Sequence, residues 1–99
     1  MAFFARYPKK LDSFVSEYIE KYPHRRKLKK GMILAAWPEV VGRAIAIQVK
    51  DVRFEGDRFL VKVENAVWRH EIHMQRHSIK SRLNAKVGEE IISDIIVIP

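Results

Sequence analysis

The hydrophobic residues of this chain change their spacing along the sequence, and this change limits the fold more than any other feature. Up to about residue 46 they recur every three or four residues, the spacing of one helical face. Between Val52 and Val63 they alternate with polar residues, as in a half-buried strand, and from Ala66 the helical spacing returns. A β-branched run follows near the end. The pattern predicts an α+β fold.

Two helices are expected before the strands. The first spans residues 8–23 and ends at Pro23, because proline has no backbone donor and clashes with the preceding turn. Its apolar face consists of Leu11, Phe14, Val15, Tyr18, Ile19 and Tyr22. The second begins near Arg26 and reaches Trp37, and Pro38 either bends it or starts a new helix.

Residues 52–55 and 59–64 are expected to form a hairpin, because Gly56-Asp57 between them is typical of a tight turn. Ile47 and Val49 are out of phase with the first of these strands, which predicts a bulge near Lys50-Asp51.

A third helix is predicted from Ala66 to about Lys86, with Asn65 as its N-cap and Gly88 at its C-terminal end. A third strand is predicted over residues 91–98. The predicted order is helix, helix, strand, strand, helix, strand.

A strand–helix–strand crossover places its helix over the sheet, so the helices are expected on one face and the other face is left open. Apolar side chains are nevertheless expected on that open face, from Leu60, Ile92, Ile96 and Ile98. We expect the face to be covered by the N-terminal segment Phe3-Phe4-Tyr7, by a second copy of the chain in a homodimer, or by a partner protein.

The length of 99 residues suits one domain, 1–99, with residues 1–9 as a flexible N-terminal segment. The chain has no Cys, which leaves no thiolate chemistry or disulfide framework and is typical of a reducing compartment. No apolar run is long enough to cross a bilayer, and the N-terminus does not resemble a secretory signal. A soluble cytoplasmic protein with no membrane contact is expected.

The net charge of +7 is the first indication of function. All of the surplus lies in the first fifty residues, since the second half has equal numbers of acidic and basic residues. Five cations fall in the six positions Arg25–Lys30, which we expect to be displayed outward and to attract phosphate polyanions or anionic lipid headgroups. The alternative is a solvated helix start that only confers solubility.

His70, His73 and His77 fall on one face of the third predicted helix, and the last two have the i, i+4 spacing of a metal-binding pair. They lie opposite Trp68, so they should face solvent without the carboxylate or dry surroundings that a metal centre needs. Together with Lys80 they are interpreted as a stripe that contacts a polyanion, with no metal and no cofactor. Plain surface is the alternative.

Catalytic motifs are absent from the sequence. There is no phosphate-binding loop of the G-x-x-x-x-G-K-[ST] type, and no serine lies in a nucleophile-elbow setting. Glu89 and Glu90 are adjacent in sequence and so should diverge, which is poor geometry for a carboxylate pair. We therefore expect a protein that is not an enzyme.

Four blocks of the sequence stand out together. They are Trp37-Pro38-Glu39-Val40-Val41-Gly42 with Ile45-Ala46, Gly56-Asp57-x-Phe59-Leu60-Val61-x-Val63, Asn65-x-x-Trp68-x-x-Glu71-Ile72, and Leu83-Asn84 with Val87-Gly88. In this order they resemble the DciA family, bacterial domains associated with loading or operating the replicative helicase DnaB. The resemblance covers about residues 10–98.

The resemblance implies a KH-like fold, a cytoplasmic location, affinity for DNA and a non-enzymatic role as a partner of DnaB. The chain departs from the family at Gln48-Val49, where members often have His-Thr, and it lacks the G-x-x-G loop with which KH domains clamp single strands. Trp37 and Trp68 fall on apolar helix faces and are assigned to the core rather than to base stacking.

The sequence thus predicts a DNA-binding adaptor of the replicative helicase that grips phosphates without reading bases. An RNA-binding KH-like module and a protein–protein scaffold are the alternatives. The candidate nucleic-acid-binding residues are Lys9, Lys10, Arg25, Arg26, Lys27, Lys29, Lys30, His70, His73, His77 and Lys80.

Overall fold

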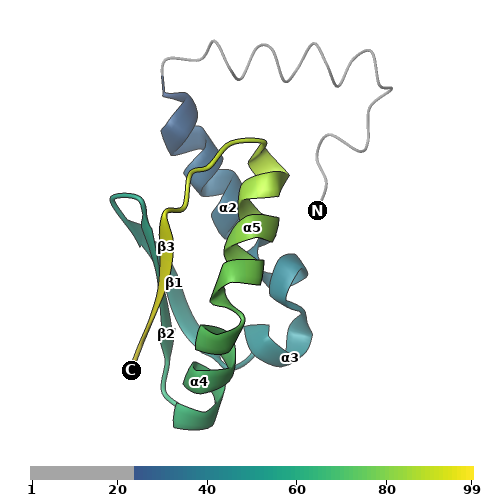
Figure 1. Ribbon diagram of the computed structural model, residues 1–99, viewed down its shortest axis with the longest axis vertical. Helices are drawn as coiled ribbons and strands as arrows, with labels where there is room; N and C mark the ends of the chain where they lie inside the picture. The colour runs from purple at the N-terminus through teal and green to yellow at the C-terminus, as the bar shows by residue number, and fades with distance from the viewer. Residues whose placement is uncertain (1–23) are drawn as a thin grey trace.

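In the part of the chain that the computed structural model describes, residues 24–99, helices lie on one face of a three-stranded sheet (Figure 1). The elements in chain order are α2 (Arg25–Val41), α3 (Arg43–Ala46), β1 (Val49–Glu55), β2 (Arg58–Val63), α4 (Ala66–Met74), α5 (Arg76–Val87) and β3 (Asp94–Ile98). The α+β class and the KH-like arrangement are confirmed. The predicted helix over residues 8–23 and the segment Phe3-Phe4-Tyr7 lie outside the described residues.

The central strand β2 pairs with β1 in the antiparallel direction and with β3 in the parallel direction. The predicted hairpin is confirmed: Glu55 pairs with Arg58 across a two-residue turn, and Gly56 adopts a φ of +66°, which glycine tolerates without strain. The predicted bulge is also confirmed, because the register shifts between Val49 and Asp51.

The core lies between β2 and the helices. Phe59, Val61 and Val63 of β2 are fully buried against apolar residues of α2, α4 and α5. The Trp37 ring lies 5.4 Å from the Phe59 ring, which confirms Trp37 as a core residue. Trp68 differs from the expectation, because it is only half buried and packs at the margin of the core.

Pro38 does not break the second helix, which continues through it to Val41. The chain then turns at Gly42, whose φ of 86° and ψ of 163° lie in a region that residues with a Cβ rarely enter. The short α3 follows and buries Ile45.

The third predicted helix is wrong as a single rod, because it is divided into α4 and α5 at Gln75. The Gln75 amide donates to the carbonyls of Glu71 and Ile72 and its backbone leaves the helical region, at φ −96° and ψ 4°. Ile72 and Ile79 are buried, but no apolar side chain is buried between them, because Met74 is 65% exposed. The caps at Asn65 and Gly88 are confirmed.

The last strand begins at Asp94 and not at residue 91. The Asn84 side chain explains this, because its Oδ1 accepts from the amides of Ile91 and Ile92 at 3.1 and 2.9 Å and its Nδ2 donates to the Ile92 carbonyl. Strand pairing would need the same backbone groups. Both isoleucines are fully buried, so Ile92 belongs to the core and not to the open face.

The face of the sheet away from the helices carries three of the four apolar residues expected there. Leu60 is buried between its strand neighbours Arg53 and Ile96, and Ile96 and Ile98 are half buried. The homodimer through this face stays a prediction.

The backbone at Gly42 predicts a contrast between two glycine substitutions. Gly42→Ala should lower the free energy of unfolding by about 1–3 kcal/mol, because alanine is strained at this φ and ψ. Gly31→Ala, inside α2 with no atom within 4 Å of an added Cβ, should raise it by about 0.5–1 kcal/mol. Urea unfolding followed by circular dichroism measures both. A Gly42→Ala variant as stable as the parent would contradict the account of this turn.

Candidate nucleic-acid interface

The cationic segment at the start of α2 is held by one carboxylate. Glu89, in the loop after α5, accepts from Arg25 Nε at 3.2 Å, from Arg26 Nη1 at 3.1 Å and from Lys29 Nζ at 3.0 Å. The Lys29 side chain is only 2% exposed. The expectation that the whole segment is displayed outward is therefore wrong for Lys29, because its ammonium is buried against Glu89.

These contacts lower the pKa of Glu89 to about 2, chiefly through the hydrogen bond from Lys29 and next through that from Arg25. The carboxylate stays ionised and cancels part of the charge of the segment. Lys27 remains exposed, and Lys30 lies over the Phe54 ring, with Nζ 5.4 Å from the ring centroid. Lys9 and Lys10 lie outside the described residues.

The Glu89 contacts predict that this carboxylate stabilises the fold. Glu89→Gln should lower the free energy of unfolding at pH 7 by roughly 2 kcal/mol, less than for a fully buried pair because Glu89 is 22% exposed. Glu90→Gln, at the exposed neighbour, should change little and is the matched control.

The same contacts predict the pH dependence of stability. The pKa of Glu89 is about 2 when folded against 4.5 ordinarily, so its stabilisation is complete above pH 4.5 and is lost as the pH falls toward 2. The unfolding curves of the parent and of Glu89→Gln should therefore converge in acid. A constant gap from pH 7 to pH 2 would contradict the assignment.

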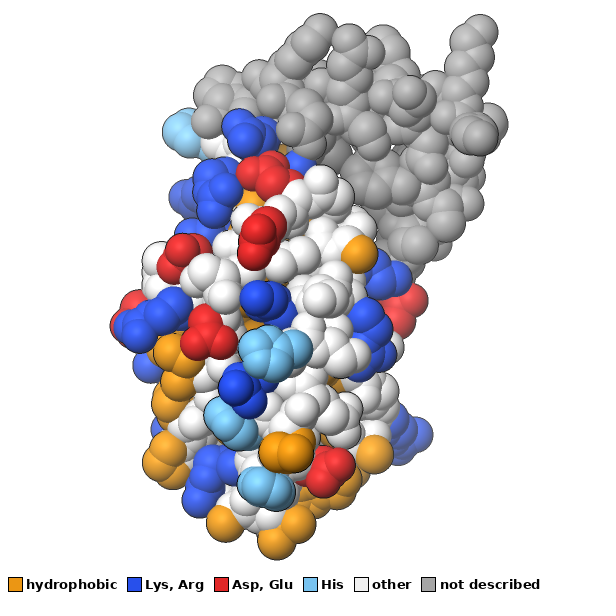
Figure 2. Space-filling view, viewed as in Figure 1, with side chains coloured by type: hydrophobic (Ala, Val, Ile, Leu, Met, Phe, Trp, Pro, Cys, Tyr) orange, Lys and Arg blue, Asp and Glu red, His pale blue; other side chains and the backbone are white. Residues whose placement is uncertain are grey.

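The predicted histidine stripe is on the surface. His70 and His73 of α4 and His77 of α5 are exposed, and Lys80 is half buried. Figure 2 shows histidine and Lys/Arg side chains in one column over α4 and α5. We call His70, His73, Arg76, His77 and Lys80 the α4–α5 face.

Backbone carbonyls, not carboxylates, position the cations of these helices. Arg76 Nη1 donates to the His73 carbonyl at 2.9 Å and lies 3.1 Å from His73 Nε2. Lys80 Nζ donates to the Ser93 carbonyl at 3.5 Å. No Asp or Glu within residues 24–99 forms an ion pair with either cation. A carbonyl is neutral, so these positive charges are oriented without being cancelled.

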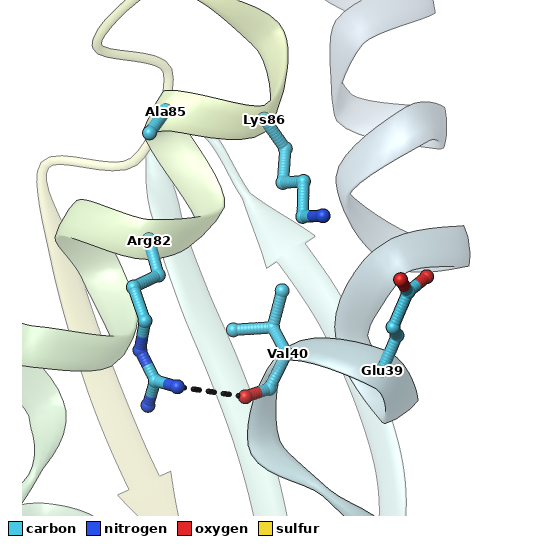
Figure 3. Close-up of a pocket in the computed structure, with 5 residues that line it drawn as sticks. All are labelled: Glu39, Val40, Arg82, Ala85 and Lys86. Atoms are coloured by element: carbon cyan, nitrogen blue, oxygen red, sulfur yellow. Dashed lines mark hydrogen bonds between the residues drawn. The ribbon is translucent and has the colours of Figure 1, made fainter. Parts of the chain in front are cut away.

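Sequence reasoning missed Arg76, Arg82 and Lys86 as members of the basic surface of α5. The signal was present, because α5 contains four Lys and Arg residues and no Asp or Glu. Arg82 and Lys86 lie on the side toward α2 and line a pocket of about 380 Å³ with Glu39, Val40 and Ala85 (Figure 3). Arg82 Nη1 crosses this pocket to donate to the Val40 carbonyl at 3.0 Å.

Three of the four cations of the hairpin have a carboxylate partner, in contrast to Arg76, Lys80 and Arg82 of α5, which donate to carbonyls. Arg58 pairs with Glu55 at 3.0 Å, Arg53 pairs with Asp51 at 3.7 Å, and Lys50 pairs with Glu64. Within residues 24–99, most Lys and Arg side chains without a carboxylate partner therefore lie on the helical side of the molecule.

Within residues 24–99, no three His, Asp or Glu side chains are placed to hold a metal ion. None of the helices in that range is long and apolar enough to span a membrane.

A family model described as Dna[CI] antecedent, DciA, matches residues 10–97. A UPF0232 protein of Rhodococcus jostii (strain RHA1) is 25% identical over 69 residues, which are 70% of this chain. The match covers 37% of that relative, so the chain spans well under two thirds of the relative's length. No solved structure matches the chain.

Proposed function

Since the chain belongs to the DciA family of DnaB-associated replication factors, we propose that it binds DNA through the α4–α5 face and serves in the cytoplasm as a non-enzymatic adaptor of the replicative helicase. The observation that carries the DNA-binding part is the set of cations on these helices that backbone carbonyls orient and that no described carboxylate neutralises.

Such a surface suits the sugar–phosphate backbone. Arg76 and Lys80 are fixed point charges beside exposed histidines, which can donate hydrogen bonds to phosphate oxygens. The α4–α5 face contains no Phe, Tyr or Trp side chain, and the connection at Gln75 has no G-x-x-G sequence. Binding should therefore be insensitive to DNA sequence.

The segment at the start of α2 has a smaller role in this proposal than its charge suggested. Lys27 and Lys30 add positive potential, while Arg25, Arg26 and Lys29 share Glu89 and mainly hold the loop after α5 against α2. Lys9 and Lys10 stay predicted contacts.

Phosphate binding of this kind predicts a steep dependence on salt. The slope of log affinity against log salt concentration should be about −3 to −5, as for roughly four to six neutralised phosphates. Fluorescence anisotropy with one labelled oligonucleotide at several salt concentrations measures it. An affinity that does not respond to salt would exclude this mode of binding.

A pair of double variants with equal charge change tests the location of the DNA site. Arg76→Gln with Lys80→Gln should weaken binding to every DNA sequence and flatten the salt slope by about 2. Arg53→Gln with Arg58→Gln removes the same charge from the hairpin, where both arginines are already paired, and should change binding much less. Equal losses in the two variants would indicate an effect of net charge alone. Thermal melting of each variant checks the fold.

The adaptor role has its own test, loading of the replicative helicase onto single-stranded DNA with and without the protein. We expect faster loading with the parent protein and less stimulation with the α4–α5 variant. Competition by structured RNA that exceeds competition by DNA at one ionic strength would instead favour an RNA-binding module.

A further inference from the structure

A pocket of about 390 Å³ lies between the end of α2, α3 and α4, and most of the residues that line it are apolar. In Figure 1, α3 and α4 lie at the end of the molecule away from the start of α2. Its lining includes Val41, Ala44, Ile45, Val67, Trp68 and Glu71. The half-buried Trp68 is thus explained, since one side of it packs on the core and the other lines this pocket.

Large apolar side chains are also exposed on and beside the elements that form the pocket. Val67, which lines the pocket, is 75% exposed. Ile47, just after α3, is 70% exposed, and Met74, at the end of α4, is 65% exposed. Figure 2 shows hydrophobic side chains gathered at this end of the molecule. Grouped exposed apolar residues of this kind mark a contact surface.

The charge of the pocket separates it from the α4–α5 face. Its one ionisable lining residue is Glu71, whose Oε1 accepts from Gln75 Nε2 at 3.4 Å. Val67 and Glu71 are four residues apart on α4 and so lie on the same side of the helix. A carboxylate beside apolar side chains repels phosphate and attracts a cation, so DNA is disfavoured here and a protein segment with a basic residue is favoured.

The lining of the pocket points the same way. It contains so few polar groups that it would orient a small polar ligand poorly. An apolar anchor inserted into a pocket with a charged pair at its rim is the usual form of a protein–protein hot spot.

We propose that the pocket between α3 and α4 docks a segment of the helicase that presents one large apolar side chain with a lysine or arginine beside it. This inference rests on the proposed function. It assigns DNA binding and helicase binding to different surfaces. The α4–α5 face binds DNA, and the α3–α4 pocket binds protein.

Two variants of the full chain test the proposal. Val67→Asp places a charge at the pocket rim in the first turn of α4, where an acidic residue is compatible with the helix dipole. Glu71→Lys reverses the charge at the rim. Each should weaken affinity for the purified replicative helicase of the same organism at least about tenfold, the scale of a hot-spot residue. Leu28→Asp, which introduces a charge at a 41% exposed position of α2, is the control and should bind the helicase like the parent.

DNA affinity and thermal melting are measured on the same proteins. The pocket would be supported if both variants lose helicase binding while their melting temperatures stay close to that of the parent. Their DNA affinity should also be kept or, for Glu71→Lys, increased. Helicase binding within threefold of the parent in both variants would overturn the pocket while leaving the adaptor role standing. Failure of the parent itself to bind the helicase would overturn the adaptor role together with the pocket, and the salt dependence of DNA binding would then be judged separately.

Discussion

The parallel pairing of β2 with β3 is the constraint on which the rest of the structure depends. Parallel neighbours cannot be joined by a tight turn, so the chain must cross over the sheet between them, and here α4 and α5 form that crossover. This crossover buries Ile72, Ile79 and Leu83 in the core. The polar side of the same two helices must then face solvent, and that side carries the histidines and cations. One topological requirement therefore builds the core and displays the basic surface.

The positive charge that each Lys or Arg contributes to the surface depends on whether its partner is a carboxylate or a carbonyl. In the hairpin, neighbouring carboxylates pair with both arginines and with Lys50. At the start of α2, Glu89 gathers three cations and ties the loop after α5 to the helix, so much of that charge serves the fold. On α4 and α5 the cations bind carbonyls and keep their full charge. The segment with the largest excess of Lys and Arg in the sequence is therefore not the surface with the most unneutralised positive charge.

The sequence was sufficient for elements defined by local chemistry. The hairpin at Gly56, the bulge before Asp51, the Asn65 and Gly88 caps and the burial of Trp37 all follow from turn residues, capping residues and hydrophobic spacing, and all were predicted. The exposure of His70, His73 and His77 followed in the same way.

The contacts that the sequence could not give are those between distant residues. Asn84 binds the backbone of residues 91 and 92 and delays the last strand, and Glu89 buries Lys29 from sixty positions away. The break at Gln75 depends on how the crossover fits the sheet. Of these differences, the Glu89 contacts changed the candidate interface, because they neutralise part of the charge at the start of α2.

The most direct measurement of the central claim is a titration of the ¹⁵N-labelled protein with a short DNA oligonucleotide, followed residue by residue by NMR. The account predicts the largest amide shifts between His70 and Lys80, shrinking as salt is added. Shifts concentrated in β1 and β2, with none along α4 and α5, would contradict it.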